Sequence, residues 1–182
     1  GGHSDICAGA VASTKENMER IFHLAKNFGG SLSDYTVWLL ERSMKTMGIR
    51  VRAQNENALA MAHFLDGLSQ IEKVYYPGLP SHQDHEIAKK QMKGFGGMLS
   101  FELNSDLDAS QFQKELSLIK PSMSLAGVES TVLSPSKTSH ALMSAEVRAE
   151  QGIADGLIRF SVGIEEVEDL KQDILQALES IK

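Results

Sequence analysis

The chain has 182 residues, enough for one ordinary domain or for one small domain with part of another, and 42% of them are hydrophobic and 23% charged. Its formal net charge of -6 argues against nucleic acid or an anionic membrane as the main partner. No apolar run approaches the ~18 residues of a membrane span, and a single cysteine, Cys7, allows no disulfide within the chain, so we expect a cytoplasmic protein without a membrane segment.

A strand followed by a helix is predicted at the start of the chain. The apolar run 6–12 predicts a buried strand. Ser13 and Glu16 form a capping box, which predicts a helix over about 14–28 that ends at two glycines. This order is typical of the last part of an α/β sheet whose other strands are absent.

Two helices with no strand between them are predicted next. The first begins at Ser33 or Asp34 and is broken by Gly48, and the second covers about 51–68. Helices in this order indicate a bridge between two domains, and we place the boundary near Asn55. Residues 1–55 are then the end of a large domain with the bridging helix, and residues 56–182 are a small C-terminal domain.

The rest of the chain alternates between strands and helices, which predicts a small sheet with helices of α/β type. Strands are predicted at 74–76, 98–103, 122–126 and 157–162. Helices are predicted at about 84–92, after Asp108, after Ser144 and over 167–181, the last with a strong amphipathic pattern. The acidic residues at the start of this last helix are expected to complement its dipole: Glu165, Glu166, Glu168 and Asp169.

Two motifs point only weakly to a ligand site. The glycine-rich run 94–97 lacks the Lys-Ser/Thr pair of a phosphate loop and precedes a strand, so it predicts a flexible turn. His82 and His85 have a spacing that could suit a metal ion, but a lone pair beside a proline favours a solvated loop. We therefore expect no metal site.

One charged residue interrupts the most apolar predicted strand. Arg159 lies between Ile158 and Phe160, where an unpaired charge would be costly. Its planar guanidinium suits a carboxylate, which it can hold with two hydrogen bonds. Two interpretations are open: a structural salt bridge to a protein carboxylate, or an anion site for a substrate carboxylate.

The stretch 156–166 around Arg159 resembles the C-terminal signature of the Cys/Met-metabolism family of pyridoxal-phosphate enzymes, which holds cystathionine γ-synthase, cystathionine γ-lyase and methionine γ-lyase. The resemblance covers nearly the whole chain, in the family's order, through the runs 2–5, 74–80, 90–97, 124–130 and 138–141. It implies a fold in which the tail of a PLP fold-type-I large domain precedes a complete small α/β domain.

The resemblance also implies roles for three residues. The family arginine that matches Arg159 holds the substrate α-carboxylate, and the serine that matches Ser124 lies beside it. The glutamate that matches Glu129 lies at the mouth of the active site and influences substrate choice; the alternative is a surface carboxylate or a partner for Arg148. The third residue of the motif is usually glycine and here is Ala126, which leaves the local backbone geometry open.

The family's Schiff-base lysine, which carries pyridoxal 5'-phosphate, is expected just before Gly1. No catalytic residue is then expected within the chain, no residue that contacts the cofactor is predicted, and the chain alone should be inactive. The intact enzyme is expected to be a PLP-dependent C–S lyase or γ-synthase of sulfur amino-acid metabolism. Its expected partners are an amino-acid substrate, the chain's own N-terminal portion and further copies in a homotetramer.

Two alternatives concern the reaction and the class of protein. The chain lacks the tryptophan and tyrosine that bacterial cystathionine β-lyases carry in the 124–129 motif, which favours γ-chemistry. Lyases and synthases share their early steps, so the sequence leaves that choice open. The rival class is a free-standing, non-catalytic small α/β module that binds a ligand or a partner.

Overall fold

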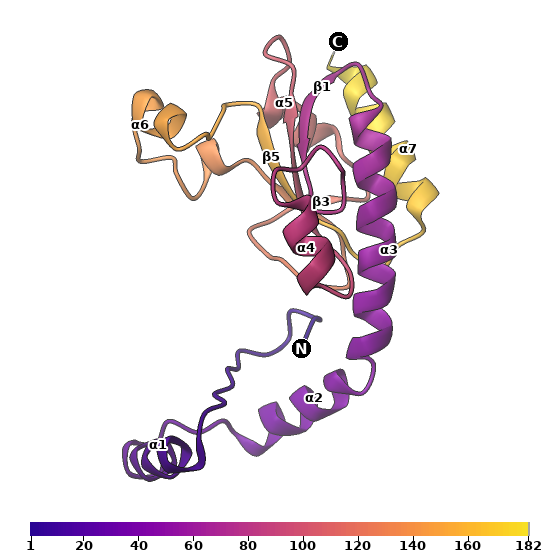
Figure 1. Cartoon of the computed structure of the whole chain (residues 1–182). Coiled ribbons are helices and arrows are strands. Elements are labelled where there is room, and N and C mark those ends of the chain that lie inside the picture. The colour runs from indigo at the N-terminus through magenta and orange to yellow at the C-terminus, as the bar shows by residue number, and fades with distance from the viewer. Residues whose placement is uncertain (182) are drawn as a thin grey trace. The chain divides into compact units, whose positions relative to one another are not determined.

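The computed structural model describes residues 1–181, and it divides the chain into two compact units, Gly1–Gly48 and Ile49–Lys182 (Figure 1). The first unit holds two helices, and the second holds a five-stranded sheet with further helices. The α/β class expected from the sequence is confirmed. None of the described helices is both long and apolar enough to cross a membrane.

The helices of the first unit begin at hydroxyl caps. In α1 (Lys15–Phe28) the Thr14 side chain accepts a hydrogen bond from the backbone N–H of Asn17, one residue later than the predicted cap. Gly29 ends α1 in the left-handed conformation, with φ of 74°, where glycine has no steric penalty. The second helix, α2 (Asp34–Met44), is capped in the same way by Ser33.

Two predictions for the first unit were wrong. Residues 6–12 form no strand, and Cys7 and Val11 in that run are exposed. A strand needs a neighbour to share its backbone hydrogen bonds, and the first unit, as described, contains no strand at all. The prediction that Gly48 ends the first bridging helix is also wrong, because α2 ends at Met44 and Gly48 lies in the first turn of α3 (Met47–Asp66). The backbone N–H groups of a first turn have no partner within their helix.

The second unit is built around one sheet in the order β1-β2-β5-β4-β3. Its strands are β1 (Ile71–Tyr75), β2 (Met98–Leu103), β3 (Lys120–Pro121), β4 (Thr131–Leu133) and β5 (Leu157–Ser161). The pairs β1–β2, β2–β5 and β4–β5 are antiparallel, and β3–β4 is parallel. The last strand in sequence therefore lies at the centre of the sheet.

The remaining helices are α4 (His85–Gln91), α5 (Ala109–Glu115), a 3-10 helix (Pro135–Lys137), α6 (Ala145–Glu150) and α7 (Val167–Ser180). All four α-helices predicted in this part are confirmed. The predicted strand 122–126 is wrong, since this segment is a loop, and the short strand β4 that follows it was not predicted. The Ser122 N–H bonds to the Val132 carbonyl of β4, but further along the backbone turns to side chains, as the bond from the Ala126 N–H to the Ser161 hydroxyl illustrates.

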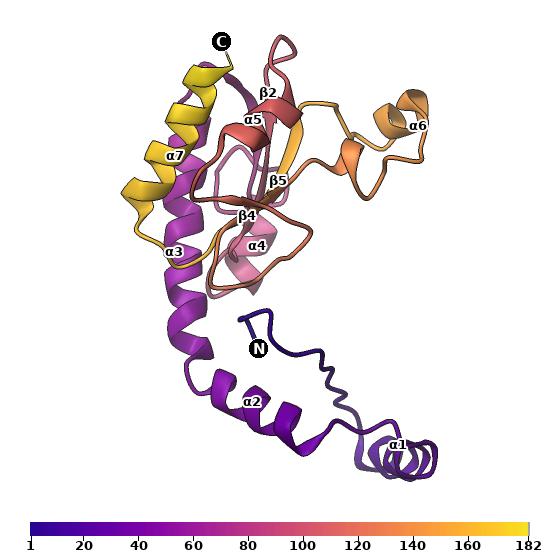
Figure 2. The ribbon, with the colours of Figure 1, turned by 180° about the vertical axis from the view of Figure 1, so that it is seen from behind.

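One face of the sheet forms the core. Alternate side chains of β2 and β5 are buried, and α3 and α7 lie side by side along that face (Figures 1 and 2). Phe101 of β2 meets Phe112 of α5 and Phe160 of β5 edge to face, with ring centroids 6.0 and 6.5 Å away. Four residues of α3 are fully buried in this core: Ala58, Met61, Ala62 and Leu65.

A buried carboxylate joins α7 to the segment that leads into β3. Asp173 is only 6% exposed, and it accepts hydrogen bonds from three successive backbone N–H groups, those of Ser117, Leu118 and Ile119, at 2.8–3.0 Å. These donors lie between α5 and β3 and belong to no helix or strand. The Asp173 carboxylate thus supplies the partners that secondary structure does not.

We predict that Asp173→Asn lowers the free energy of unfolding by about 1–3 kcal/mol, because the amide turns an NH₂ group toward backbone donors that need an acceptor. Urea unfolding followed by circular dichroism measures this. Asp66→Asn changes an exposed carboxylate at the end of α3 and should shift the unfolding free energy by less than about 0.5 kcal/mol. Equal shifts for the two variants would contradict the prediction.

Candidate functional site

The arginine singled out by the sequence lies in the central strand. Arg159 is the middle residue of β5, with Ser100 of β2 opposite it on one side and Leu133 of β4 on the other. Its neighbours Ile158 and Phe160 are fully buried in the core. Because side chains alternate along a strand, Arg159 emerges on the opposite face of the sheet, where it is half-buried.

The guanidinium of Arg159 is positioned by neutral groups. Its Nη2 donates to the backbone carbonyls of Met123 and Ser124, at 3.2 and 3.0 Å. The Nε atom is buried and has no hydrogen-bond partner among the residues that the structure describes. Within residues 1–181 no ion pair involves Arg159, so the structural salt bridge considered as an alternative is not found there. A half-buried cation without a counter-charge is suited to binding an anion.

Residues 122–130, which we call the 122–130 loop, supply those two carbonyls. The Ser124 carbonyl also accepts a hydrogen bond from the Thr131 hydroxyl at 3.0 Å. Further along, the Gly127 carbonyl accepts a bond of 2.6 Å from Nε2 of Gln54 in α3. Backbone hydrogen bonds hold the loop near its ends, where the Ser122 N–H donates to the Val132 carbonyl and the Val128 carbonyl accepts from the Ile164 N–H. Between them, side chains of the surrounding elements hold it.

The end of the 122–130 loop is fixed by a carboxylate just beyond β5. Glu165 accepts hydrogen bonds from the backbone N–H and the hydroxyl of Ser130, at 2.5 and 2.8 Å, and this hydroxyl accepts from the Gly163 N–H at 2.9 Å. A side chain at Gly163 would collide with the backbone carbonyl of Val128. The predicted role of Glu165, to complement the dipole of α7, is therefore incomplete, because both of its carboxylate oxygens bind Ser130.

The other two predicted site residues differ in how they relate to Arg159. Ser124 is in direct contact with Arg159 through its backbone carbonyl. Glu129 is exposed, and no hydrogen bond or ion pair in the described chain joins it to the arginine. Arg148 pairs with Asp155 at 2.9 Å, so the alternative that made Glu129 its partner is wrong. The role of Glu129 at the mouth of an active site stays a prediction.

The two weak motifs form local structure. His85 makes a 2.8 Å hydrogen bond through Nδ1 with the Pro77 carbonyl and stacks on Phe95, with ring centroids 5.7 Å apart. No group of three potential metal ligands occurs among the described residues. In the glycine-rich run, Gly96 has a φ of 85° and donates its N–H to the Asn55 side chain, which agrees with the predicted turn.

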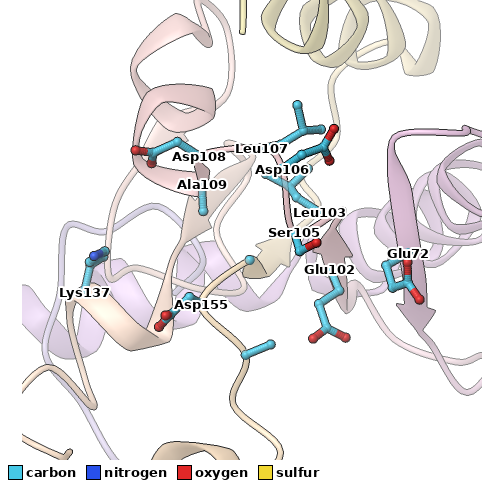
Figure 3. Close-up of a pocket in the computed structure, with 12 residues that line it drawn as sticks. Glu72, Glu102, Leu103, Ser105, Asp106, Leu107, Asp108, Ala109, Lys137 and Asp155 are labelled. Atoms are coloured by element: carbon cyan, nitrogen blue, oxygen red, sulfur yellow. The ribbon is translucent and has the colours of Figure 1, made fainter. Parts of the chain in front are cut away.

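A cavity of about 740 Å³, shown in Figure 3, does not include Arg159 in its lining. It contains none of the three predicted site residues, and its charged lining consists of Glu72, Glu102, Asp106, Asp108, Asp155 and Lys137. At its edge the Tyr75 hydroxyl donates to Glu102 at 2.9 Å, and burial, followed by this hydrogen bond, raises the pKa of Tyr75. So many carboxylates repel anions, and the cavity does not suit a phosphate-bearing cofactor.

Four residues hold the 122–130 loop without having been predicted to do so: Gln54, Thr131, Ser161 and Glu165. Thr131 lies directly after the Ser124–Ser130 motif, and Ser161 directly after the arginine-bearing run, so their position beside motifs was an available signal. Gln54 offered none, because 73 residues separate it from Gly127 and it lies in an otherwise regular helix.

Three comparisons relate the chain to known proteins. The family model described as "Cys/Met metabolism PLP-dependent enzyme" matches residues 1–179. Cystathionine beta-lyase of Lactococcus lactis subsp. cremoris (strain MG1363) is 47% identical over 98% of this chain and 47% of its own length. Cystathionine gamma-lyase of Bacillus subtilis (strain 168) is 44% identical over all of this chain and 48% of its own length.

The fold of the chain also matches that of a solved structure. The crystal structure of cystathionine gamma synthase from Xanthomonas oryzae pv. oryzae in complex with cystathionine matches with a TM-score of 0.89 and 41% identity. The match covers 98% of this chain and 46% of the synthase. The chain therefore spans about half the length of the relatives that it matches.

We predict that Ala126→Gly stabilises the protein, because Ala126 has a φ of 57°, in the left-handed region that glycine adopts freely. Relief of about 1–2 kcal/mol of steric cost should outweigh the extra chain entropy of glycine, for a net gain of up to about 1 kcal/mol. The same replacement at Ala60, inside α3, should destabilise by about 0.5–1 kcal/mol. Urea unfolding of both variants measures the two signs, and destabilisation by Ala126→Gly would refute the strain.

Proposed function

Because the chain belongs to the family of Cys/Met metabolism PLP-dependent enzymes, we propose that it is the C-terminal part of an enzyme acting on sulfur amino acids, in which Arg159 binds the substrate α-carboxylate. The observation that carries the proposal is the half-buried Arg159 guanidinium with no counter-charge among the described residues. Ser124 supports it through its carbonyl contact with the arginine, and Glu129 is proposed to influence substrate choice from the mouth of the site.

The described residues do not themselves fit the cofactor. Toward Arg159 the 122–130 loop presents the carbonyl oxygens of Met123 and Ser124, whereas a phosphate group needs N–H donors. A single carboxylate fits this arrangement better, since it needs only the guanidinium. We therefore propose that another part of the intact enzyme binds pyridoxal 5'-phosphate and supplies the lysine that carries it. Residues 1–55 are then the end of that cofactor-binding domain.

The part of the reaction that this chain performs is substrate binding and orientation. The core holds β5 in place, and the two backbone carbonyls orient the Arg159 guanidinium, so the cation is already in position before an amino acid arrives. A fixed carboxylate defines where the α-carbon and the side chain of the substrate lie. Such positioning contributes to the rate by lowering the entropic cost of reaching the reactive geometry.

The substrate that we propose is cystathionine or a closely related sulfur amino acid. The names of the relatives support this class, and they include both a beta-lyase and gamma-acting enzymes. The 124–129 motif lacks the tryptophan and tyrosine expected of β-lyases, which supports reaction at the γ-carbon. The rival interpretation, a free-standing non-catalytic module, is not favoured, because the family match covers residues 1–179.

The proposed partners follow from the same membership. We propose that the chain works together with an N-terminal portion that completes the large domain, and that the intact enzyme is a cytoplasmic homotetramer. Support for a missing partner surface comes from the first unit, whose helices bury no large apolar side chain and leave several exposed: Phe22, Leu24, Phe28, Tyr35, Val37 and Trp38.

We predict that the chain alone is inert. Mixed with pyridoxal 5'-phosphate and reduced with borohydride, it should show no stoichiometric label on any single lysine, and it should not cleave cystathionine. The reason is that the residues described here offer no site for the cofactor. Peptide mass spectrometry and a thiol-release assay measure both properties. One lysine labelled to completion, together with turnover, would overturn the division of the active site proposed here.

We predict that Arg159→Ala in the intact enzyme lowers kcat/KM for cystathionine by about 100- to 1,000-fold, because it leaves the substrate carboxylate unpaired. Most of the loss should appear in KM, since the carboxylate is bound in the ground and transition states alike. Steady-state kinetics measure this, and cofactor absorbance should be unchanged.

Arg148→Ala is the matched control for this experiment. Arg148 also donates to a backbone carbonyl, that of Met143, and it has its own carboxylate partner in Asp155. Its replacement should leave KM within about twofold of the unsubstituted enzyme, because it binds no substrate group. Near-normal kcat/KM in Arg159→Ala, or loss of cofactor with substrate binding retained, would make Arg159 a structural residue and end the proposal.

A further inference from the structure

A single carbonyl oxygen links Arg159 to a residue of the neighbouring strand. The Ser124 carbonyl accepts two hydrogen bonds, one from Nη2 of Arg159 and one from the hydroxyl of Thr131, each 3.0 Å long. A carbonyl oxygen has two lone pairs, so these two donors satisfy it fully. The direction in which the Ser124 carbonyl points is therefore set by the arginine on one side and the threonine on the other.

Thr131 is well placed to be the rigid member of this arrangement. It is the first residue of β4, it is 7% exposed, and it lies opposite Ser161 in the register with β5. Its β-branched side chain is also stiff at χ1, which fixes the hydroxyl relative to the strand. Ser124, by contrast, lies in the 122–130 loop, whose backbone belongs to no helix or strand.

The other carbonyl that contacts the guanidinium has no such support. The Met123 carbonyl oxygen lies 3.2 Å from Nη2 in an exposed position, and Met123 as a whole residue is 68% exposed. Of the two contacts that orient Arg159, only the one through Ser124 is thus connected to the sheet by a buried side chain.

We propose that Thr131 is a positioning residue for substrate binding, whose hydroxyl fixes the Ser124 carbonyl and through it the Arg159 guanidinium. This inference rests on the proposed function, because it assigns Thr131 to the same carboxylate site. It places no part of Thr131 in contact with the substrate. Its effect should therefore be found in how well the carboxylate binds and not in the chemical step.

The test compares Thr131→Val with Thr131→Ser in the intact enzyme. Valine keeps the shape of threonine and removes the hydroxyl, so KM for cystathionine should rise about fivefold, the effect of one neutral hydrogen bond, with kcat within about twofold. Serine keeps the hydroxyl and should restore KM to within about twofold of the original. Should the valine variant fail to fold, Thr131→Ala takes its place against serine.

The matched control is Ser180→Ala, which also removes a hydroxyl that donates to a backbone carbonyl, that of Gln176 in α7, and should leave KM unchanged. A double-mutant cycle adds a second readout. In an Arg159→Lys background, Thr131→Val should have no further effect on KM, because the group that it positions is gone.

Three results would overturn the inference: an unchanged KM in Thr131→Val, a serine variant as impaired as the valine variant, or additive effects of Thr131→Val and Arg159→Lys. Additivity would mean that Thr131 acts on the fold in general. If the unsubstituted enzyme does not cleave cystathionine at all, the proposed function fails and this inference fails with it. If it does so and only the Thr131 results differ from expectation, the proposed function stands alone.

Discussion

In β5 successive side chains point to opposite faces of the sheet, and the rest of the second unit depends on this alternation. Ile158 and Phe160 are buried in the core that α3 and α7 cover. Because side chains alternate along the strand, Arg159 then lies on the opposite face of the sheet. A shift of one residue would place the arginine in the core and the two apolar side chains outside, at a cost of several kcal/mol. The hydrophobic core therefore determines on which face of the sheet the charged group lies.

The 122–130 loop shows a second way of positioning functional groups. It lies outside the sheet, yet four side chains hold it: Gln54 from α3, Thr131 from β4, Ser161 from β5 and Glu165 from beyond β5. A loop fixed in this manner can present backbone carbonyls as firmly as a strand would. Ala126 shows what this requires, since it is held at a φ of 57° that only the surrounding contacts can maintain.

The sequence predicted those features that depend on residues close together in the chain, and it missed those that depend on residues far apart. The alternation in 98–103 and the amphipathic period of 167–181 are local, and both elements are as predicted within one residue. Arg159 could be found because a charge in an apolar run is a local anomaly. β4 has three residues, too few to show a pattern. The strand prediction for 6–12 was wrong because a strand depends on neighbouring strands that its own residues cannot indicate. The bond between Gln54 and Gly127 joins positions 73 residues apart and leaves no trace in local sequence.

The strand order β1-β2-β5-β4-β3 also has a consequence for synthesis of the protein. The two outer pairs of strands are joined only by β5, which leaves the ribosome after both of them. At ordinary translation rates, on the order of several seconds pass between the synthesis of β2 and that of β5, during which the backbone N–H and C=O groups on that edge of β2 are unpaired. The nascent chain thus passes through a stage in which an unpaired strand edge is exposed, and the same strand that carries Arg159 brings that stage to an end.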